Sequence, residues 1–130
     1  WHVGINSLLA STGAGLVKAH RIFQDPQLLA LAQRQIDWVY GANVFNASTV
    51  TGFGHHVPDG HHVGNMQPPK TPDIIGGVMN GIAGHLENDS LYIHEVGYPV
   101  SEYWTPMVAY TMWLESELMT TAVDNPVARY

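Results

Sequence analysis

The sequence predicts a mainly α fold in which a long, ordered loop region separates the last helix from the others. Apolar residues recur at helical spacing at both ends of the chain, over residues 5–40 and 105–122. Between them, residues 41–100 hold ten of the thirteen Gly and six of the eight His, with no sustained period of either kind. The 130 residues are 45% apolar, which is enough for the core of one domain.

The first helix is predicted over residues 5–23. Its apolar stripe consists of Ile5, Leu8, Leu9, Leu16, Ala19, Ile22 and Phe23. A second helix is predicted over residues 26–40, because Asp25 can cap a helix that opens with Pro26. Its stripe consists of Leu28, Leu31, Ala32, Gln35, Ile36 and Val39. Gly41 stands where a left-handed C-cap is wanted, and the short connection at residues 24–25 predicts an antiparallel helical hairpin.

The loop region is expected to pack against the helices, because it is rich in large apolar side chains. These are Phe45, Phe53, Ile74, Ile75, Tyr92, Ile93 and Tyr98. A connection of this length inside one domain is typical of a functional loop.

The last helix is predicted to start at the capping residue Thr105, followed by Pro106, and to end near Ala122. Its first half is apolar all round, with Met107, Val108, Ala109, Tyr110, Met112, Trp113 and Leu114. Such a helix should be buried on nearly every side. The chain also begins at Trp1 without an initiator Met. We therefore expect residues 1–130 to be the C-terminal fragment of one larger domain, whose N-terminal part is the partner of this helix.

Composition excludes several classes of function. Five Lys and Arg against eleven Asp and Glu leave a formal net charge of −6 and no basic stripe for nucleic acid. No apolar run approaches the ~18 residues of a membrane span, so a membrane partner is not expected. The chain has no Cys, and it contains neither a GxGxxG nor a GxxxxGK[ST] motif for nucleotides.

A dense histidine cluster lies in the loop region. It consists of His55, His56, Asp59, His61 and His62. Neutral imidazoles suit Zn, Cu or Ni, but Pro58 and Gly60 exclude a ligand-bearing helix. In an extended chain, adjacent His side chains point to opposite faces, so at most one of each pair should face a common point. The sequence therefore predicts that no metal and no other cofactor is bound. The other possible roles of these His side chains are hydrogen bonds to the loop backbone or to a polar substrate.

A second cluster combines carboxylates with aromatic rings before the last helix. It consists of Asp89, Tyr92, His94, Glu95, Tyr98, Glu102, Tyr103 and Trp104. Aromatic faces can stack on pyranose rings, and a protonated carboxyl can deliver a proton to a leaving oxygen. The cluster therefore points to sugar chemistry. The alternatives are structural: Glu102 could favour the dipole of the following helix, and Glu95 could be a solvated loop carboxylate.

Several sequence blocks resemble the C-terminal part of glycoside hydrolase family 9. Residues 35–45 read QIDWVYGANVF, residues 48–54 read STVTGFG, residues 76–80 read GGVMN, and the pairs His61-His62 and Glu95-Val96 follow the same order. The resemblance implies the C-terminal portion of an (α/α)6 barrel of the six-hairpin glycosidase type. It also implies an inverting hydrolase of β-glucan or a related plant or microbial polysaccharide.

The resemblance also implies roles for individual residues. His62 matches the active-site histidine, but His61 stands where the family has Pro, and Gly64 where it has a substrate-binding Arg. Glu95 is the first candidate for the general acid and Glu102 the second, because the spacing to the last helix fits neither fully. Sugar contacts are expected from His56, His61, His62, Phe53, Tyr98 and Trp104. The family's catalytic Asp has no counterpart in this sequence.

The rival hypothesis is a non-catalytic helical module that binds glycan or metal through the His-rich loop. A third possibility is an inactive barrel relative that binds glycans without cutting them, and Gly64 in place of the expected Arg is its best argument. For the enzyme, an oligosaccharide or polysaccharide is the expected partner. A secreted, periplasmic or cell-surface location is expected, with the cytoplasm left open.

Overall fold

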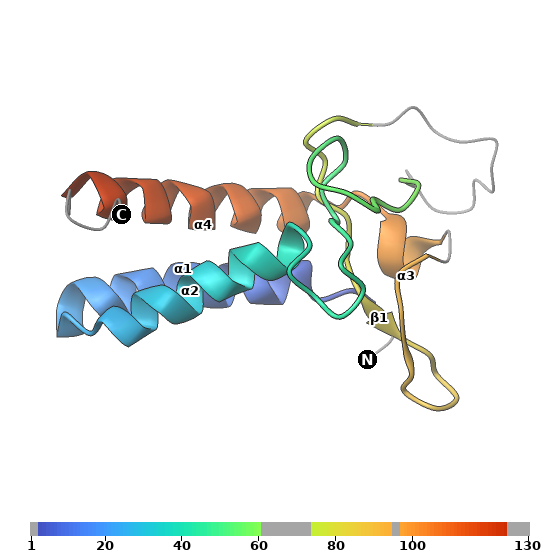
Figure 1. Cartoon of the computed structure of the whole chain (residues 1–130), viewed down its shortest axis with the longest axis horizontal. Helices are drawn as coiled ribbons and strands as arrows, with labels where there is room; N and C mark the ends of the chain where they lie inside the picture. Colours follow the sequence, from blue (N-terminus) through green and yellow to red (C-terminus); the bar gives the residue numbers. More distant parts are fainter. Residues whose placement is uncertain (1–2, 61–73, 95–96, 125–130) are drawn as a thin grey trace.

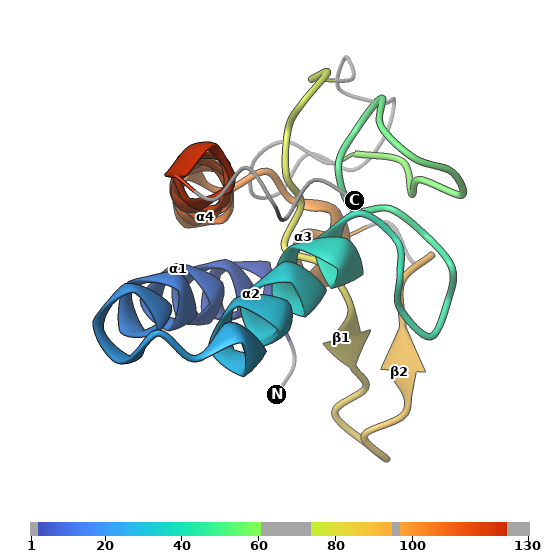
Figure 2. The same ribbon diagram turned by 60° about the vertical axis from the view of Figure 1, so that its left-hand side comes forward.

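Three long helices are the main elements of the described structure. The computed structural model describes residues 3–60, 74–94 and 97–124. The long helices are α1 (Asn6–Phe23), α2 (Pro26–Val39) and α4 (Thr105–Asp124). Helix α1 packs against both α2 and α4, and the three lie side by side (Figures 1 and 2). The prediction of a mainly α fold is confirmed.

The loop segments gather at one end of these helices, where α1 and α4 begin and α2 ends (Figure 1). They contain the one-turn helix α3 (Tyr98–Ser101) and the short strands β1 (Ala83–Gly84) and β2 (Leu91–Tyr92). The strands pair antiparallel, with Ala83 opposite Tyr92. Two isolated bridges join Val50 to Val78 and Met79 to Tyr103. The sequence analysis predicted none of these short elements, because each is too short to carry a period.

The predicted start of α2 is confirmed in detail. The Asp25 side chain accepts a hydrogen bond from the Gln27 amide at 2.9 Å, and Pro26 is the first helical residue. Gln24 closes α1 in a left-handed conformation, so α1 and α2 form the expected antiparallel hairpin. Gly41 follows α2 with a φ of +120°, a region that favours glycine.

The predicted cap of α4 is wrong by one residue. The Trp104 carbonyl accepts from the amides of Met107 and Val108, and Thr105 is already helical. Thr105 is therefore the first residue of the helix rather than its cap.

The predicted apolar stripe of α1 is not its buried face. Leu8, Ile22 and Phe23 are exposed, and the helix buries a face of small residues instead. The hydrophobic members of that face are Ala10, Ala14 and Val17, and Gly13 lies among them. A Cβ built on Gly13 would lie 2.6 Å from a methyl carbon of Leu114 on α4. Small side chains occupy the buried face because they let α1 and α4 approach each other closely.

Within the described residues α4 is covered on one face, and the expectation that the N-terminal part of the domain covers the rest stays a prediction. Met107, Thr111 and Leu114 are buried against α1 and α2, whereas Met112 is 63% exposed and Trp113 is 40% exposed. Among the described residues, α1 and α2 lie on one side of α4 (Figure 2), and Met107, Thr111 and Leu114 are the buried residues of its first half.

Candidate active site

The loop that leads to the His-rich cluster begins with a tight turn over residues 48–55. The Ser48 amide donates to the His55 carbonyl at 3.0 Å, and the Phe53 amide donates to the Val50 carbonyl at 3.2 Å. Gly52 and Gly54 have φ values of +80° and +77°, and a Cβ on Gly54 would lie 2.7 Å from the Cβ of Ser48. The turn therefore requires glycine at these positions, and it leaves the Phe53 ring exposed.

Tyr103 joins this loop to the segment before α4. Its hydroxyl lies 2.6 Å from the hydroxyl of Thr51, across 52 residues of sequence. A Cβ on Gly60 would lie 1.8 Å from the Tyr103 hydroxyl oxygen, and a Cβ on Gly77 would lie 2.8 Å from the Tyr103 ring. Tyr103 is thus seated between two glycines, and it holds the start of the His-rich loop against residues 102–104.

Glu102 follows directly after α3 with extended backbone, at φ −71° and ψ 136°. Its carbonyl accepts from the Asn80 amide at 3.0 Å, and its side chain is half-buried. The neighbouring residue, Tyr103, carries the contact to Thr51. The segment that bears this carboxylate is therefore fixed beside the loop that leads to the histidines.

The predicted stacking rings lie on these same segments. Phe53 belongs to the tight turn, Tyr98 begins α3, and Trp104 immediately precedes α4; all three side chains are exposed. Among the described residues no ring contact joins these three side chains to one another. The fold thus gathers the segments at one end of the helices and leaves the rings open to a ligand.

His56 does not take the orientation expected from extended chain. It has a left-handed φ of 53°, and its Nδ1 lies 3.0 Å from the Asn46 carbonyl oxygen. His55 Nε2 lies 2.9 Å from Asn46 Oδ1, so both rings turn toward the same residue. The expectation that such a pair points to opposite faces is wrong here, because the positive φ reverses the direction of one side chain. His56 takes the role of bonding loop backbone through one ring nitrogen.

Several predicted site residues lie outside the described residues. They are Glu95, His61, His62 and the departure Gly64. Within residues 3–60, 74–94 and 97–124, no group of three His, Asp or Glu side chains is arranged to hold a metal ion. Because His61 and His62 of the cluster are outside this range, the prediction that it binds no metal stays a prediction, and metal binding stays the alternative hypothesis.

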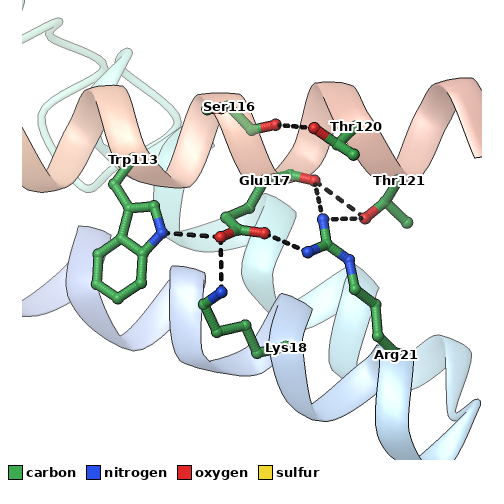
Figure 3. A network of polar contacts seen from close by, with 7 residues as sticks. All are labelled: Lys18, Arg21, Trp113, Ser116, Glu117, Thr120 and Thr121. Carbon is green, nitrogen blue, oxygen red and sulfur yellow. Dashed lines mark hydrogen bonds and ion pairs between the residues drawn. The ribbon is translucent and has the colours of Figure 1, made fainter.

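The largest pKa shifts among the described groups belong to Glu117 on α4 and to Tyr40 at the end of α2. Glu117 on α4 accepts hydrogen bonds from Lys18 at 2.9 Å and from Trp113 at 2.8 Å, and it also pairs with Arg21 (Figure 3). These bonds, the one from Lys18 first, lower the pKa of Glu117 to about 2. Burial and the hydrogen bond to Glu115 raise the pKa of Tyr40 to about 12. The ion pairs and hydrogen bonds around Glu117 join α1 to α4. The lowered pKa of Glu117 therefore comes from contacts that hold these two helices together.

A cavity of about 330 Å³ lies between α1, α2 and the β1–β2 hairpin. It is lined by Ile5, Leu9, Arg34, Gln35, Trp38, Ile82 and Leu91. None of these is a predicted site residue. Its walls are mainly apolar, so it does not offer the converging carboxylates and imidazoles that glycoside cleavage needs.

Residues 1–113 match the family model described as glycosyl hydrolase family 9. The chain belongs to glycosyl hydrolase family 9. A search of the curated proteins found no match. Family 9 membership makes a carbohydrate the substrate class and glycoside hydrolysis the associated activity. Within the described part of this family 9 chain, no helix has both the length and the apolar character to cross a membrane.

Two residues that hold the segments of the candidate site together were not among the predicted site residues. Thr51 had no special signal beyond its place in a family 9 sequence block, and Asn80 was only the last letter of another block. Both act through contacts more than 15 residues away in the sequence, to Tyr103 and to Tyr98. Asn80 is the one polar residue of the block GGVMN, which could have marked it, whereas Thr51 shares its block with Ser48 and Thr49 and has no such mark.

Proposed function

We propose that this chain forms part of the active site of an inverting glycoside hydrolase that cleaves β-glucan or a related plant or microbial polysaccharide. The observation that carries the proposal is the 2.6 Å contact between the Thr51 and Tyr103 hydroxyls. It holds the loop that leads to His61 and His62 beside the segment that bears Glu102. A proton donor and imidazoles would then share one surface.

In the proposed reaction, a Glu protonates the departing glycosidic oxygen while an Asp outside this chain activates water on the opposite face. The two carboxyls would stand ~6.5–9.5 Å apart to admit that water. Both Glu95 and Glu102 are candidates for the acid. The half-buried position of Glu102 and its fixed backbone support it as the donor, because a general acid must be held within reach of the leaving oxygen.

The sugar would be bound by imidazoles and aromatic rings. We assign hydrogen bonds with sugar hydroxyls to His62 and His61, and to the Nε2 atom of His56, since its Nδ1 is engaged by Asn46. Stacking platforms are assigned to Phe53, Tyr98 and Trp104, each more than half exposed at 51%, 57% and 56%. The remaining sugar contacts and the Asp would come from the N-terminal part of the same domain. A secreted, periplasmic or cell-surface location belongs to the same proposal.

The test replaces each candidate acid in the enzyme that carries this chain. Glu102→Gln and Glu95→Gln are compared with Glu87→Gln, a matched control at an exposed carboxylate of the β1–β2 turn. Loss of a general acid lowers turnover by about 10²–10⁴-fold, and oligosaccharide binding should persist. The control should keep full turnover.

Two outcomes would contradict the proposal. If both Gln variants kept full turnover, neither residue would be the proton donor. If the unmodified enzyme bound β-glucan oligosaccharides without cleaving them, the non-catalytic module would be the better description. Calorimetric titration with Zn²⁺ then separates a glycan binder from a metal binder, since a stoichiometric, tight site would favour metal.

A further inference from the structure

We infer that Asn80 is a positioning residue that sets the place of the Glu102 carboxyl for proton transfer. The inference rests on the proposed function, with Glu102 as the acid. Asn80 lies in the loop segment before β1, and its side chain is 1% exposed. It is not one of the residues expected to contact substrate, so its effect would pass through the backbone of the Glu102 segment.

Asn80 holds both ends of the segment that runs from Tyr98 to Glu102. Its side-chain amide donates to the carbonyl of Tyr98, the first residue of α3, at 2.6 Å. Its backbone amide donates to the carbonyl of Glu102, just after α3, at 3.0 Å. Between them, the Gly81 amide donates to the Val100 carbonyl at 2.9 Å. A single helical turn has few hydrogen bonds of its own, so these three bonds, together with the 2.7 Å bond from the Gly4 amide to the Pro99 carbonyl, determine where it lies.

Asn80 is itself fixed from the opposite side by the helices. The backbone amide of Asn6, at the start of α1, donates to the Asn80 carbonyl at 3.0 Å. The Asn6 side chain donates to the Met79 carbonyl at 3.0 Å and to the Thr49 hydroxyl at 2.7 Å. Thr49 in turn donates to the Val39 carbonyl at the end of α2 at 2.9 Å. A continuous buried chain of hydrogen bonds thus runs from α2 and α1 through Asn80 to Glu102.

The side chain of Asn80 is the replaceable link in this chain. Without its N–H donor, the Tyr98 carbonyl loses this partner, and the start of α3 is held by one bond fewer, that from the Gly4 amide to the Pro99 carbonyl remaining. The Glu102 side of the turn is then held by its backbone bonds and by the Thr51–Tyr103 contact. Proton transfer requires hydrogen-bond contact with the leaving oxygen, so a small displacement of Glu102 should cost rate more than binding.

The test compares Asn80→Ala and Asn80→Asp on two substrates in the enzyme that carries this chain. Asp keeps the size of Asn, and its ionised form has no donor for the Tyr98 carbonyl, so this variant is assayed above the pKa of the new carboxyl. One substrate is a β-glucan oligosaccharide, whose alcohol leaving group needs a proton. The other is a 2,4-dinitrophenyl β-glycoside, whose leaving group departs without one.

We expect both variants to lose about 10-fold or more in kcat on the oligosaccharide, with KM nearly unchanged, and much less on the dinitrophenyl glycoside. The ratio of the two rates does not depend on how much protein is folded, so simple destabilisation cannot imitate this result. Leu114→Ala is the control for destabilisation, because Leu114 is 0% exposed in the core of the long helices and belongs to none of these hydrogen bonds. It should lower both rates by the same factor.

The outcomes separate this inference from the proposed function. An unmodified enzyme that cleaves neither substrate overturns both. A Glu102→Gln enzyme that keeps its preference for the oligosaccharide removes Glu102 as the acid, and the positioning role falls with it. If Glu102→Gln loses only the oligosaccharide activity while both Asn80 variants keep the ratio of the unmodified enzyme, the proposed function stands and the role of Asn80 is overturned.

Discussion

The contact between Thr51 and Tyr103 can be tested with a double-mutant cycle. The two single changes are Tyr103→Phe and Thr51→Val, each of which removes one hydroxyl and keeps the shape of the side chain. Thr51 is only 5% exposed, so Tyr103→Phe leaves its hydroxyl buried without this partner. Leaving a buried hydroxyl unpaired costs about 1–3 kcal/mol. Tyr103 is half-buried, so Thr51→Val should cost less, about 1 kcal/mol.

The double variant has no unpaired hydroxyl left at this contact. It should therefore be no less stable than Tyr103→Phe alone, which corresponds to a coupling energy of about 1 kcal/mol. Urea unfolding measures each free energy of unfolding, provided that the m-value is the same in all four proteins. Tyr110→Phe, at an exposed tyrosine of α4, is the control and should change stability by less than about 0.5 kcal/mol.

Additive single changes, with a coupling below about 0.3 kcal/mol, would refute this reasoning. The hydroxyls would then not bond to each other in solution. The 50–60 loop and the Glu102 segment would have to be held together by other contacts, and the proposal for the active site would lose its carrying observation.

Two further predictions concern the helix frame. Gly15→Ala should stabilise the fold by about 0.5–1 kcal/mol, because no atom lies within 4 Å of its Cβ position and Ala is the better helix former. The Gly13→Ala variant should be less stable than the Gly15→Ala variant by about 1–3 kcal/mol, since the new Cβ would lie 2.6 Å from Leu114. If thermal unfolding showed equal stability for the two variants, the close packing of α1 on α4 would be contradicted. For Glu117, the pKa of the folded state is lowered from 4.5 to about 2, so its stabilising contribution is present above pH 4.5 and is lost as the pH falls toward 2. Glu117→Gln should remove about 1 kcal/mol at pH 7 and flatten the loss of stability below pH 4.5, and an unchanged acid profile would rule out this ion cluster as its cause.

The helix boundaries were predicted correctly where a residue type has a characteristic place at a helix end, such as Asp-Pro at its start and Gly after its end. The Asp25-Pro26 pair marked the start of α2, and the stripe containing Ala32, Ile36 and Val39 is its buried face. Gly41 has the positive φ expected after that helix. These features depend on neighbours within one or two helical turns, and such neighbours can be read along the chain.

The face of α1 was mispredicted because the largest apolar residues were taken as the core. The buried face follows Ala10, Gly13, Ala14 and Val17, whose small side chains permit close contact with two helices at once. Leu8, Ile22 and Phe23 stay exposed. Hydrophobicity alone cannot rank these two faces, because the choice depends on how closely α4 and α2 approach.

By itself, the sequence determined the family, the helical class and the residue types available for sugar cleavage. Sequence blocks and helix caps involve residues close together in the chain, so they can be recognised without the tertiary structure. Only the tertiary structure decided that Thr51 meets Tyr103, that Asn80 holds both ends of α3, and that His55 and His56 turn toward Asn46. The physical reason is that hydrogen bonds between distant loop segments depend on the path of the backbone, which helix packing fixes and which no period in the sequence records.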